Sequence, residues 1–185
     1  VFHPAAVQRM DLPARYVLFV GSLQPRKNLA GLLEAWRLIE AEVADVWLVI
    51  AGTDGRQFRA IHLPASERVL FLGYVPDTSL SGLYAHAELF ILPSFDEGFG
   101  LPILEAMASG TPVLAAAAGA LPEVVAQAGL TFDPADSNGM ADSLRRSLND
   151  EGLRASLRLR GLARAAEFPW EIPAEKIWSV LEACR

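Results

Sequence analysis

Short apolar runs recur along the chain, and most of them end at a glycine or a proline. The runs that predict strands cover residues 16–20, 45–51, 69–72, 89–92, 113–115 and 130–132. Most of these runs lack the alternation of polar and apolar residues that a half-exposed strand shows. We therefore expect strands that are buried on both faces, as in a parallel sheet.

Between these runs, apolar positions recur at the period of a helix. Asn28 can cap a helix in which Leu29, Leu32, Leu33 and Trp36 share one face. Further helices are predicted from Asp77 towards His86, after Leu101-Pro102, from Leu121, and over 137–148, 152–167 and 172–183. Strands that alternate with helices predict an α/β fold, a Rossmann-like parallel sheet with helices on both faces.

Composition and charge narrow the class of protein. The chain has 185 residues, enough for the core of one domain, and no apolar run approaches the roughly 18 residues of a membrane span. A formal charge of −6 disfavours nucleic-acid binding, which would need a basic footprint. The single Cys184 allows no internal disulfide, and no export signal is visible at the start of the chain, so we expect a cytoplasmic protein.

One stretch carries the candidate chemistry, namely the loop and helix that follow the predicted strand 89–92. Gly98 and Gly100 let the backbone approach a ligand, and Leu101-Pro102 can open a helix without losing a hydrogen bond. The free N–H groups of such a helix start, together with the helix dipole, favour a bound phosphate. Glu97 and Glu105 add two carboxylates near the carboxyl end of the same strand.

This stretch resembles the signature of retaining glycosyltransferases of family 4, which have the GT-B fold. The matching residues are Pro93-Ser94, the run from Glu97 to Pro102, and the run from Glu105 to Val113. The resemblance implies the C-terminal, donor-binding domain of a bacterial-type enzyme of polysaccharide biosynthesis. Such an enzyme transfers a hexose, mannosyl-type or similar, from a nucleoside-diphosphate sugar to a carbohydrate or lipid-linked acceptor.

The same resemblance implies roles for the two glutamates and the loop between them. Glu105 would accept hydrogen bonds from the ribose hydroxyls, and Glu97 would lie at the transferred sugar, where it forms the catalytic pair with Lys27. Backbone N–H groups around Gly98, Phe99, Gly100 and Leu101 would hold the distal phosphate as the diphosphate leaves.

Other donor-binding residues are expected in the loops after the first three strands. Arg26 and Lys27 are expected to clamp the diphosphate, with a solvated basic turn as the alternative, and Ser22 stands where the family often carries an arginine. The remaining expected donor contacts are Gly52 and Thr53, within the turn Gly52-Thr53-Asp54-Gly55, and Tyr74 and Val75 at the nucleobase. A plain turn and a structural strand exit are the alternatives at these two places.

Neither a cofactor nor a metal is expected. His3, His62 and His86 are scattered without the spacing of metal ligands, and the two basic side chains with the helix start can neutralise the leaving diphosphate. We assign residues 1–14 to a linker from a missing N-terminal domain, 15–168 to the nucleotide-sugar-binding domain, and 169–185 to a C-terminal helix. The expected partners are the sugar donor and the N-terminal acceptor domain of the same chain.

Four further interpretations compete with this one. A catalytically silent binding or assembly module would keep the fold, whereas a hydrolase with two carboxylates, an epimerase and an NAD-dependent dehydrogenase have less support in the motifs. Six arginines crowd the last part of the chain: Arg145, Arg146, Arg154, Arg158, Arg160 and Arg164. A solvated helix face is the favoured interpretation of these arginines, and peripheral contact with anionic lipid at the inner membrane's cytoplasmic face is the alternative.

Overall fold

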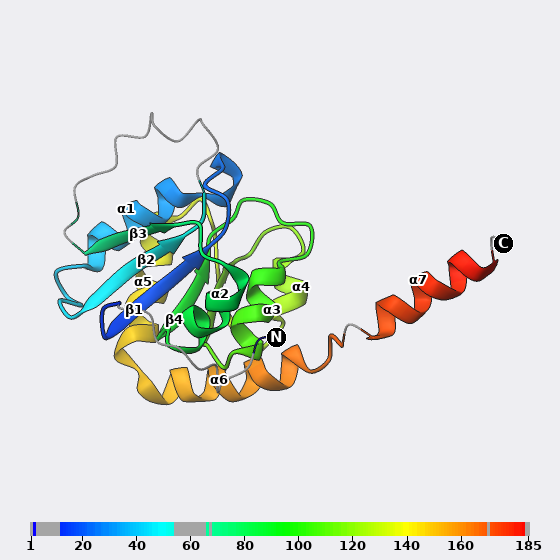
Figure 1. The fold of residues 1–185 in the computed structure, drawn as a ribbon. Coiled ribbons are helices and arrows are strands. Elements are labelled where there is room, and N and C mark those ends of the chain that lie inside the picture. Colours follow the sequence, from blue (N-terminus) through cyan, green and yellow to red (C-terminus); the bar gives the residue numbers. More distant parts are fainter. Residues whose placement is uncertain (1, 3–11, 54–65, 67, 170, 184–185) are drawn as a thin grey trace.

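The computed structural model describes residues 2, 12–53, 66, 68–169 and 171–183. Its centre is a six-stranded sheet with the order β3-β2-β1-β4-β5-β6, in which every neighbouring pair is parallel (Figure 1). The strands are β1 (Arg15–Val20), β2 (Val46–Ala51), β3 (Val69–Gly73), β4 (Leu89–Leu92), β5 (Val113–Ala116) and β6 (Leu130–Phe132). The predicted fold class is therefore confirmed, and all six predicted strands are present.

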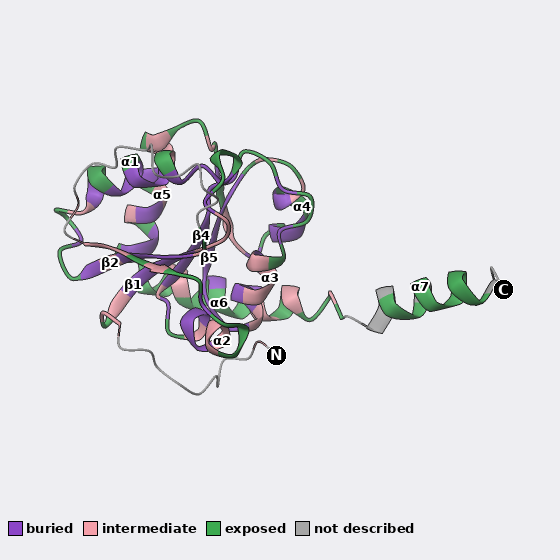
Figure 2. Ribbon diagram, turned by 45° about the horizontal axis from the view of Figure 1, so that its top comes forward, coloured by how far each residue is buried: buried purple, intermediate pink, exposed green. Residues whose placement is uncertain are grey.

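The helices cover both faces of the sheet. They are α1 (Leu29–Ile39), α2 (Asp77–Ala85), α3 (Leu101–Ala108), α4 (Leu121–Val125), α5 (Ser137–Asn149), α6 (Glu151–Ala165) and α7 (Glu171–Ala183), with a 3-10 turn η1 (Pro25–Lys27). Helices α1 and α5 pack together on one face, and α2, α3 and α4 lie on the other (Figure 2). As predicted, Asn28 caps α1, because its side chain accepts a hydrogen bond from Gly31 N at 3.3 Å.

The core consists of β1, β2, β4 and β5 and the inner faces of the helices packed on them, whereas β3 and β6, at the two edges of the sheet, are partly exposed. Strands β4 and β5 are buried at every residue, as expected for central strands covered on both sides (Figure 2). Trp36, Tyr16 and Tyr84 are the largest side chains that are fully buried. Chain order reverses between β1 and β4, so the loops that follow these two strands meet outside their carboxyl ends, at the switch point where sheets of this kind bind ligands.

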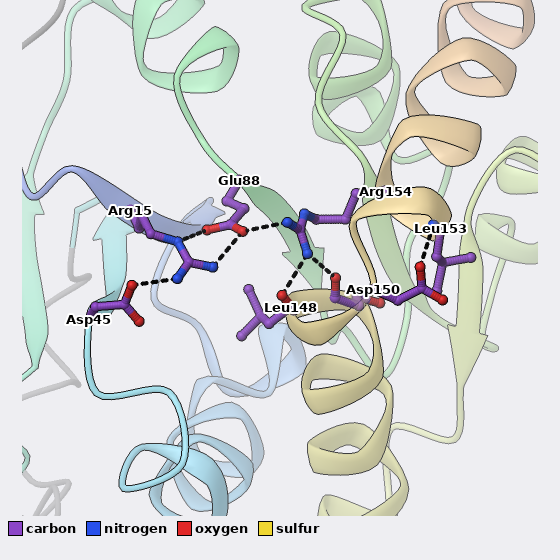
Figure 3. Close-up of polar contacts among 8 residues, drawn as sticks. Arg15, Asp45, Glu88, Leu148, Asp150, Leu153 and Arg154 are labelled. Carbon is purple, nitrogen blue, oxygen red and sulfur yellow. Dashed lines mark hydrogen bonds and ion pairs between the residues drawn. The ribbon is translucent and has the colours of Figure 1, made fainter.

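A polar cluster closes the opposite, amino-terminal edge of the sheet. Glu88, which precedes β4, accepts hydrogen bonds from Arg15 at 2.8 Å and pairs with Arg154 of α6 at 3.0 Å (Figure 3). Arg15 also binds Asp45 at the start of β2, and Arg154 donates to Leu148 O at 2.6 Å. This cluster therefore connects the starts of β1, β2 and β4 with α6, at the edge of the sheet opposite the loops that follow β1 and β4.

The arginines of α6 bind the domain itself. Arg154, Arg158, Arg160 and Arg164 each donate to backbone carbonyl oxygens of other segments, at distances from 2.6 to 3.0 Å. The acceptors are Ser147, Leu148, Gly110, Gln127, Val124 and Glu123. Arg158 and Arg160 are nevertheless exposed, as the favoured interpretation of a solvated helix face expects, whereas Arg154 and Arg164 are half-buried. The four-residue spacing predicts a shared face for Arg154 with Arg158 and for Arg160 with Arg164. It does not reveal the carbonyl groups that these side chains bind.

The last helix stands apart from the rest of the fold. Helix α7 extends away from the sheet, and Ile177, Trp178, Val180 and Leu181 on it are each more than half exposed (Figure 1). Among the described residues, no helix combines the length and the apolar character that a membrane span requires. Most of the predicted linker 1–14, together with His3, His62 and Cys184, lies outside the described residues.

Candidate functional site

The candidate site is built where the loop after β1 meets the loop after β4. Phe95 N donates to Arg26 O at 2.8 Å, which joins the two loops through their backbones. The 3-10 turn η1 places Arg26 and Lys27 at this junction, and it ends at Asn28 in the left-handed conformation with φ 53°. Residues that are about seventy positions apart in sequence therefore lie together at this switch point.

Glu97 is the centre of this junction. Its side chain is only 9% exposed, and Lys27, which is 8% exposed, binds its Oε1 oxygen. Ser94 Oγ donates to the same oxygen at 2.7 Å, and Arg26 Nη1 lies 3.6 Å from Oε2. A buried carboxylate is tolerated when cations and donors compensate it, and Glu97 has both. The structure thus brings the predicted pair of Glu97 and Lys27 into direct contact.

A third loop, which follows β5, supports the backbone of Glu97. Ala120 N donates to Glu97 O at 3.0 Å, and Gly119 packs so closely that an added Cβ would lie 2.7 Å from that oxygen. Gly119 also has a φ of 54°, a conformation that favours glycine. Sequence reasoning missed the roles of Ser94 and Gly119, although the small-residue run 116–120 was a signal that another segment approaches closely there.

The glycine loop and the start of α3 leave backbone donors available. Gly100 caps α3 with φ 88°, and Pro102 stands in the first turn, as the sequence predicted. An added Cβ at Gly98 would meet nothing within 4 Å, so open space lies beside the loop. Within the described part of the chain, the backbone bonds that hold this loop do not use the N–H groups of Gly98, Phe99 or Gly100. The arrangement suits an anionic group at the helix start.

Glu105 occupies a different environment in the second turn of α3. It is half-buried, and Tyr84 Oη of α2 donates to its Oε2 oxygen at 2.9 Å. Burial raises the pKa of Glu105, the hydrogen bond from Tyr84 lowers it, and the charge of Asp77 raises it further. Burial also holds the pKa of Tyr84 well above its usual value, so this hydroxyl keeps its proton and stays a donor.

The other predicted donor contacts lie at the same edge of the sheet, further towards β3. Gly52 has a φ of 152° and touches the β1 loop, because an added Cβ would lie 1.8 Å from Gly21 O. Thr53 is exposed and its carbonyl accepts from Leu23 N at 3.2 Å, which also fits the plain-turn interpretation of this place. Asp54 and Gly55 of that turn lie outside the described residues.

Two residues after β3 and one after β1 complete the predicted set. Tyr74 is 70% exposed, whereas the side chain of Val75 is buried. Ser22 is half-buried in the β1 loop. Among the described contacts, none of the three bonds to Lys27 or Glu97. The described residues also include no group of three or more histidine, cysteine, aspartate or glutamate side chains that could hold a metal ion.

Comparison with families of known proteins gives a match over most of the chain. Residues 6–164 match the family model described as "Glycosyl transferases group 1". Over 162 residues the chain is 43% identical to the O-antigen chain mannosyltransferase B of Escherichia coli, and the match covers 84% of this chain and 42% of that protein. The chain therefore spans less than half the length of this relative.

Solved structures also match this chain over most of its length. Sucrose-phosphate synthase from Thermosynechococcus elongatus superimposes with a TM-score of 0.83 at 29% identity, covering 99% of this chain and 51% of that one. HepE from Anabaena, solved in complex with UDP and glucose, superimposes with a TM-score of 0.81 at 26% identity, covering 92% of this chain and 48% of that one. In both cases the chain corresponds to about half of a longer structure.

Proposed function

The chain belongs to the glycosyl transferases group 1 family, and from this premise we propose that it is the donor-binding half of a retaining glycosyltransferase. The proposed reaction transfers a hexose from a nucleoside-diphosphate sugar to a carbohydrate or lipid-linked acceptor. The observation that carries the proposal is the contact of Lys27 with Glu97 beside the start of α3.

This contact supports separate roles for the basic side chains and for Glu97 within the site. When the bond between the anomeric carbon and the diphosphate breaks, negative charge develops on the leaving group. Lys27, Arg26 and the backbone N–H groups at the start of α3 are placed to bind that charge. Glu97, held by Ser94, would face the sugar and stabilise positive character at the anomeric carbon, while the acceptor hydroxyl forms the new bond and gives its proton to the leaving diphosphate oxygen. Glu105 would bind the ribose.

The donor class is supported by the relatives. A mannosyltransferase with 43% identity supports a hexose of the mannosyl type, and the complex of HepE with UDP and glucose supports a nucleotide as the bound group. Because two cationic side chains and a helix start can neutralise a diphosphate, we propose that the site works without a metal. Unchanged binding of the nucleotide after treatment with a chelator is the expected result.

The partner that we propose is an N-terminal half that carries the acceptor. Its support is the length of the relatives, of which this chain covers about half, and the exposed apolar surface on two parts of the structure. One part is α7, and the other is the rim of the glycine loop, where Phe95, Phe99 and Leu101 are each more than 40% exposed. Exposed apolar patches of this kind are typical of surfaces that another domain covers.

A cytoplasmic location with peripheral contact to an anionic membrane completes the proposal. The arginines of α6 give this contact little support, because all four donate hydrogen bonds to backbone carbonyls, although Arg158 and Arg160 are exposed, as is Arg146 of α5. Cosedimentation with acidic and neutral vesicles tests the contact. Equal binding to both would remove it from the proposal.

Calorimetric titration with UDP, GDP and ADP tests the main proposal. We expect binding of at least one of the three, and its loss in the double variant Lys27→Ala with Glu105→Ala. The proposal fails if the wild-type chain binds none of them, or if the double variant binds as the wild type does. A silent binding module is the second candidate, and a full-length protein that keeps its turnover after Glu97→Ala would favour it.

A further inference from the structure

Tyr84 is a buried side chain for which the reaction scheme above has no role. It lies in α2, is fully buried, and its hydroxyl hydrogen reaches across to Glu105 of α3, with 2.9 Å between Oη and Oε2. This contact joins two helices through the residue to which we assign the ribose. A buried tyrosine hydroxyl usually has a hydrogen-bond partner. Here the partner is a carboxylate of the proposed binding site, so the hydrogen bond also affects how that carboxylate meets the ligand.

The position of the Tyr84 ring is fixed from several sides. Its ring meets Phe90 of β4 edge to face, with centroids 5.4 Å apart, and Phe2 in the same way at 5.6 Å. Thr111 Oγ1 donates to the backbone carbonyl of Tyr84 at 2.6 Å. Because the ring is held by the core, the hydroxyl is a fixed point against which the longer and more flexible Glu105 side chain is oriented.

The hydrogen bond from Tyr84 gives the two carboxylate oxygens of Glu105 different surroundings. Oε2 is bound from the protein side by Tyr84, and the half-buried carboxylate keeps Oε1 as its other acceptor. A carboxylate can accept a pair of hydroxyl hydrogen bonds only if its plane is set towards both of them. A carboxylate without a fixed partner would have to lose rotational freedom at the moment of binding, which weakens affinity.

We propose that Tyr84 is a positioning residue, which holds the carboxylate of Glu105 in the orientation that accepts the ribose hydroxyls of the donor. The inference rests on the proposed function, because it assumes that Glu105 binds ribose. It adds a determinant of the preference for ribonucleotides that lies outside the loop and helix of the motif.

The charges around Glu105 agree with this role. Burial raises the pKa of Glu105, and Asp77 at the start of α2 raises it further by repulsion. Tyr84 acts in the opposite direction and favours the ionised form, which accepts hydrogen bonds from both hydroxyls. Removal of the Tyr84 hydroxyl therefore shifts the pKa of Glu105 upward, and ribonucleotide binding should require a higher pH.

The test compares Tyr84→Phe with the wild type in binding UDP, GDP and ADP and the 2′-deoxy counterpart of each. For the nucleotide that binds, we expect the wild type to favour the ribo form by about tenfold or more, the size of a hydrogen bond to a charged group. Tyr84→Phe should lose most of this preference, mainly by weaker binding of the ribo form. The pH midpoint of binding should move upward.

Tyr16→Phe is the matched control. It removes another buried tyrosine hydroxyl, that of Tyr16 in β1, which donates to Leu83 O of α2 at 2.6 Å, whereas the described hydrogen bond to Glu105 comes from Tyr84. This variant should keep the ribose preference and the pH midpoint. Circular dichroism of each variant confirms the fold before binding is compared.

Each outcome decides between the inference and the proposed function. If Glu105→Gln abolishes the ribose preference while Tyr84→Phe keeps the wild-type preference and midpoint, the positioning role is overturned and the proposed function stands. If Glu105→Gln itself leaves the preference intact, the assignment of ribose to Glu105 fails. Should Tyr84→Phe not fold, Glu105→Asp replaces it, because this change shortens the side chain and withdraws the carboxylate from Tyr84. A retained preference in Glu105→Asp overturns the positioning role.

Discussion

Glu97 and Glu105 belong to one short segment, yet the fold gives them opposite surroundings. Glu97 is buried, and it is bound by Lys27 and Ser94 with Arg26 nearby. Glu105 is half-buried, and its hydrogen-bond partner is an uncharged hydroxyl, that of Tyr84. The difference shows that the spacing of two carboxylates says little about how they act. Glu97 is fixed by opposite charge where two loops meet, and Glu105 is half-buried and accepts from a neutral hydroxyl.

Removal of the cation from Glu97 should have the largest effect. In Lys27→Met the carboxylate stays buried without its main partner, and we expect a loss of about 3–5 kcal/mol in the free energy of unfolding. Urea denaturation of this variant, of Glu97→Gln and of the double variant measures the coupling between the two residues. The double variant should recover part of the loss. Strictly additive losses would show that the two side chains are not coupled and would break the comparison.

Removal of the hydroxyl that binds Glu97 should have a smaller effect. Ser94 is fully buried, so Ser94→Ala should cost about 1.5–3 kcal/mol, the range for a hydrogen bond to a charged group. Ser137→Ala is the matched control, because Ser137 Oγ donates to the carboxylate of Glu34 at 3.0 Å on the exposed surface. We expect the control to change stability by roughly 0.5 kcal/mol or less. Equal losses in both variants would mean that burial does not strengthen the Glu97 contact.

The smallest effect should be a change in how stability depends on pH. The pKa of Glu105 is raised in the folded state, so the folded protein holds this proton more tightly than the unfolded chain. The contribution to stability is complete below the unfolded pKa of about 4.3 and is lost as pH rises through the folded pKa. Glu105→Gln should remove this loss, and Tyr84→Phe should enlarge it.

Urea midpoints over a pH series that starts below the ordinary glutamate pKa measure this dependence. Tyr16→Phe serves as the control, since it removes the buried hydroxyl that donates to Leu83 O and should keep the wild-type slope. If the pH dependence of stability were unchanged in Glu105→Gln, this would contradict the proposed difference between the surroundings of Glu97 and Glu105.

Local signals predicted most of the fold. Apolar runs predicted all six strands, and capping or proline signals predicted the starts of α1, α3 and α4. The contact of Lys27 with Glu97 could be anticipated as well, because loops that follow neighbouring parallel strands meet at one edge of the sheet. The rule applies to residues seventy positions apart, such as Lys27 and Glu97, because it depends on the order of the strands and not on side-chain packing.

Contacts that depend on side-chain packing could not be predicted in this way. The helical pattern placed Tyr84 in a helix but gave no sign that its hydroxyl reaches Glu105 in the next one. The spacing of Arg154 and Arg158 predicted a shared face, yet their acceptors are backbone carbonyls, which no side-chain pattern reveals. Gly119 was visible as part of a run of small residues, but its contact with Glu97 depends on how two loops cross.

The close contact between Gly52 and Gly21 limits which residues of the proposed donor site can be varied. No side chain fits at Gly52, because even a methyl group would overlap the carbonyl oxygen of Gly21. Random mutagenesis at this position should therefore return glycine almost exclusively among folded variants. A library aimed at a new nucleotide should vary Thr53 and Tyr74 instead, since both side chains are exposed at the same edge of the sheet.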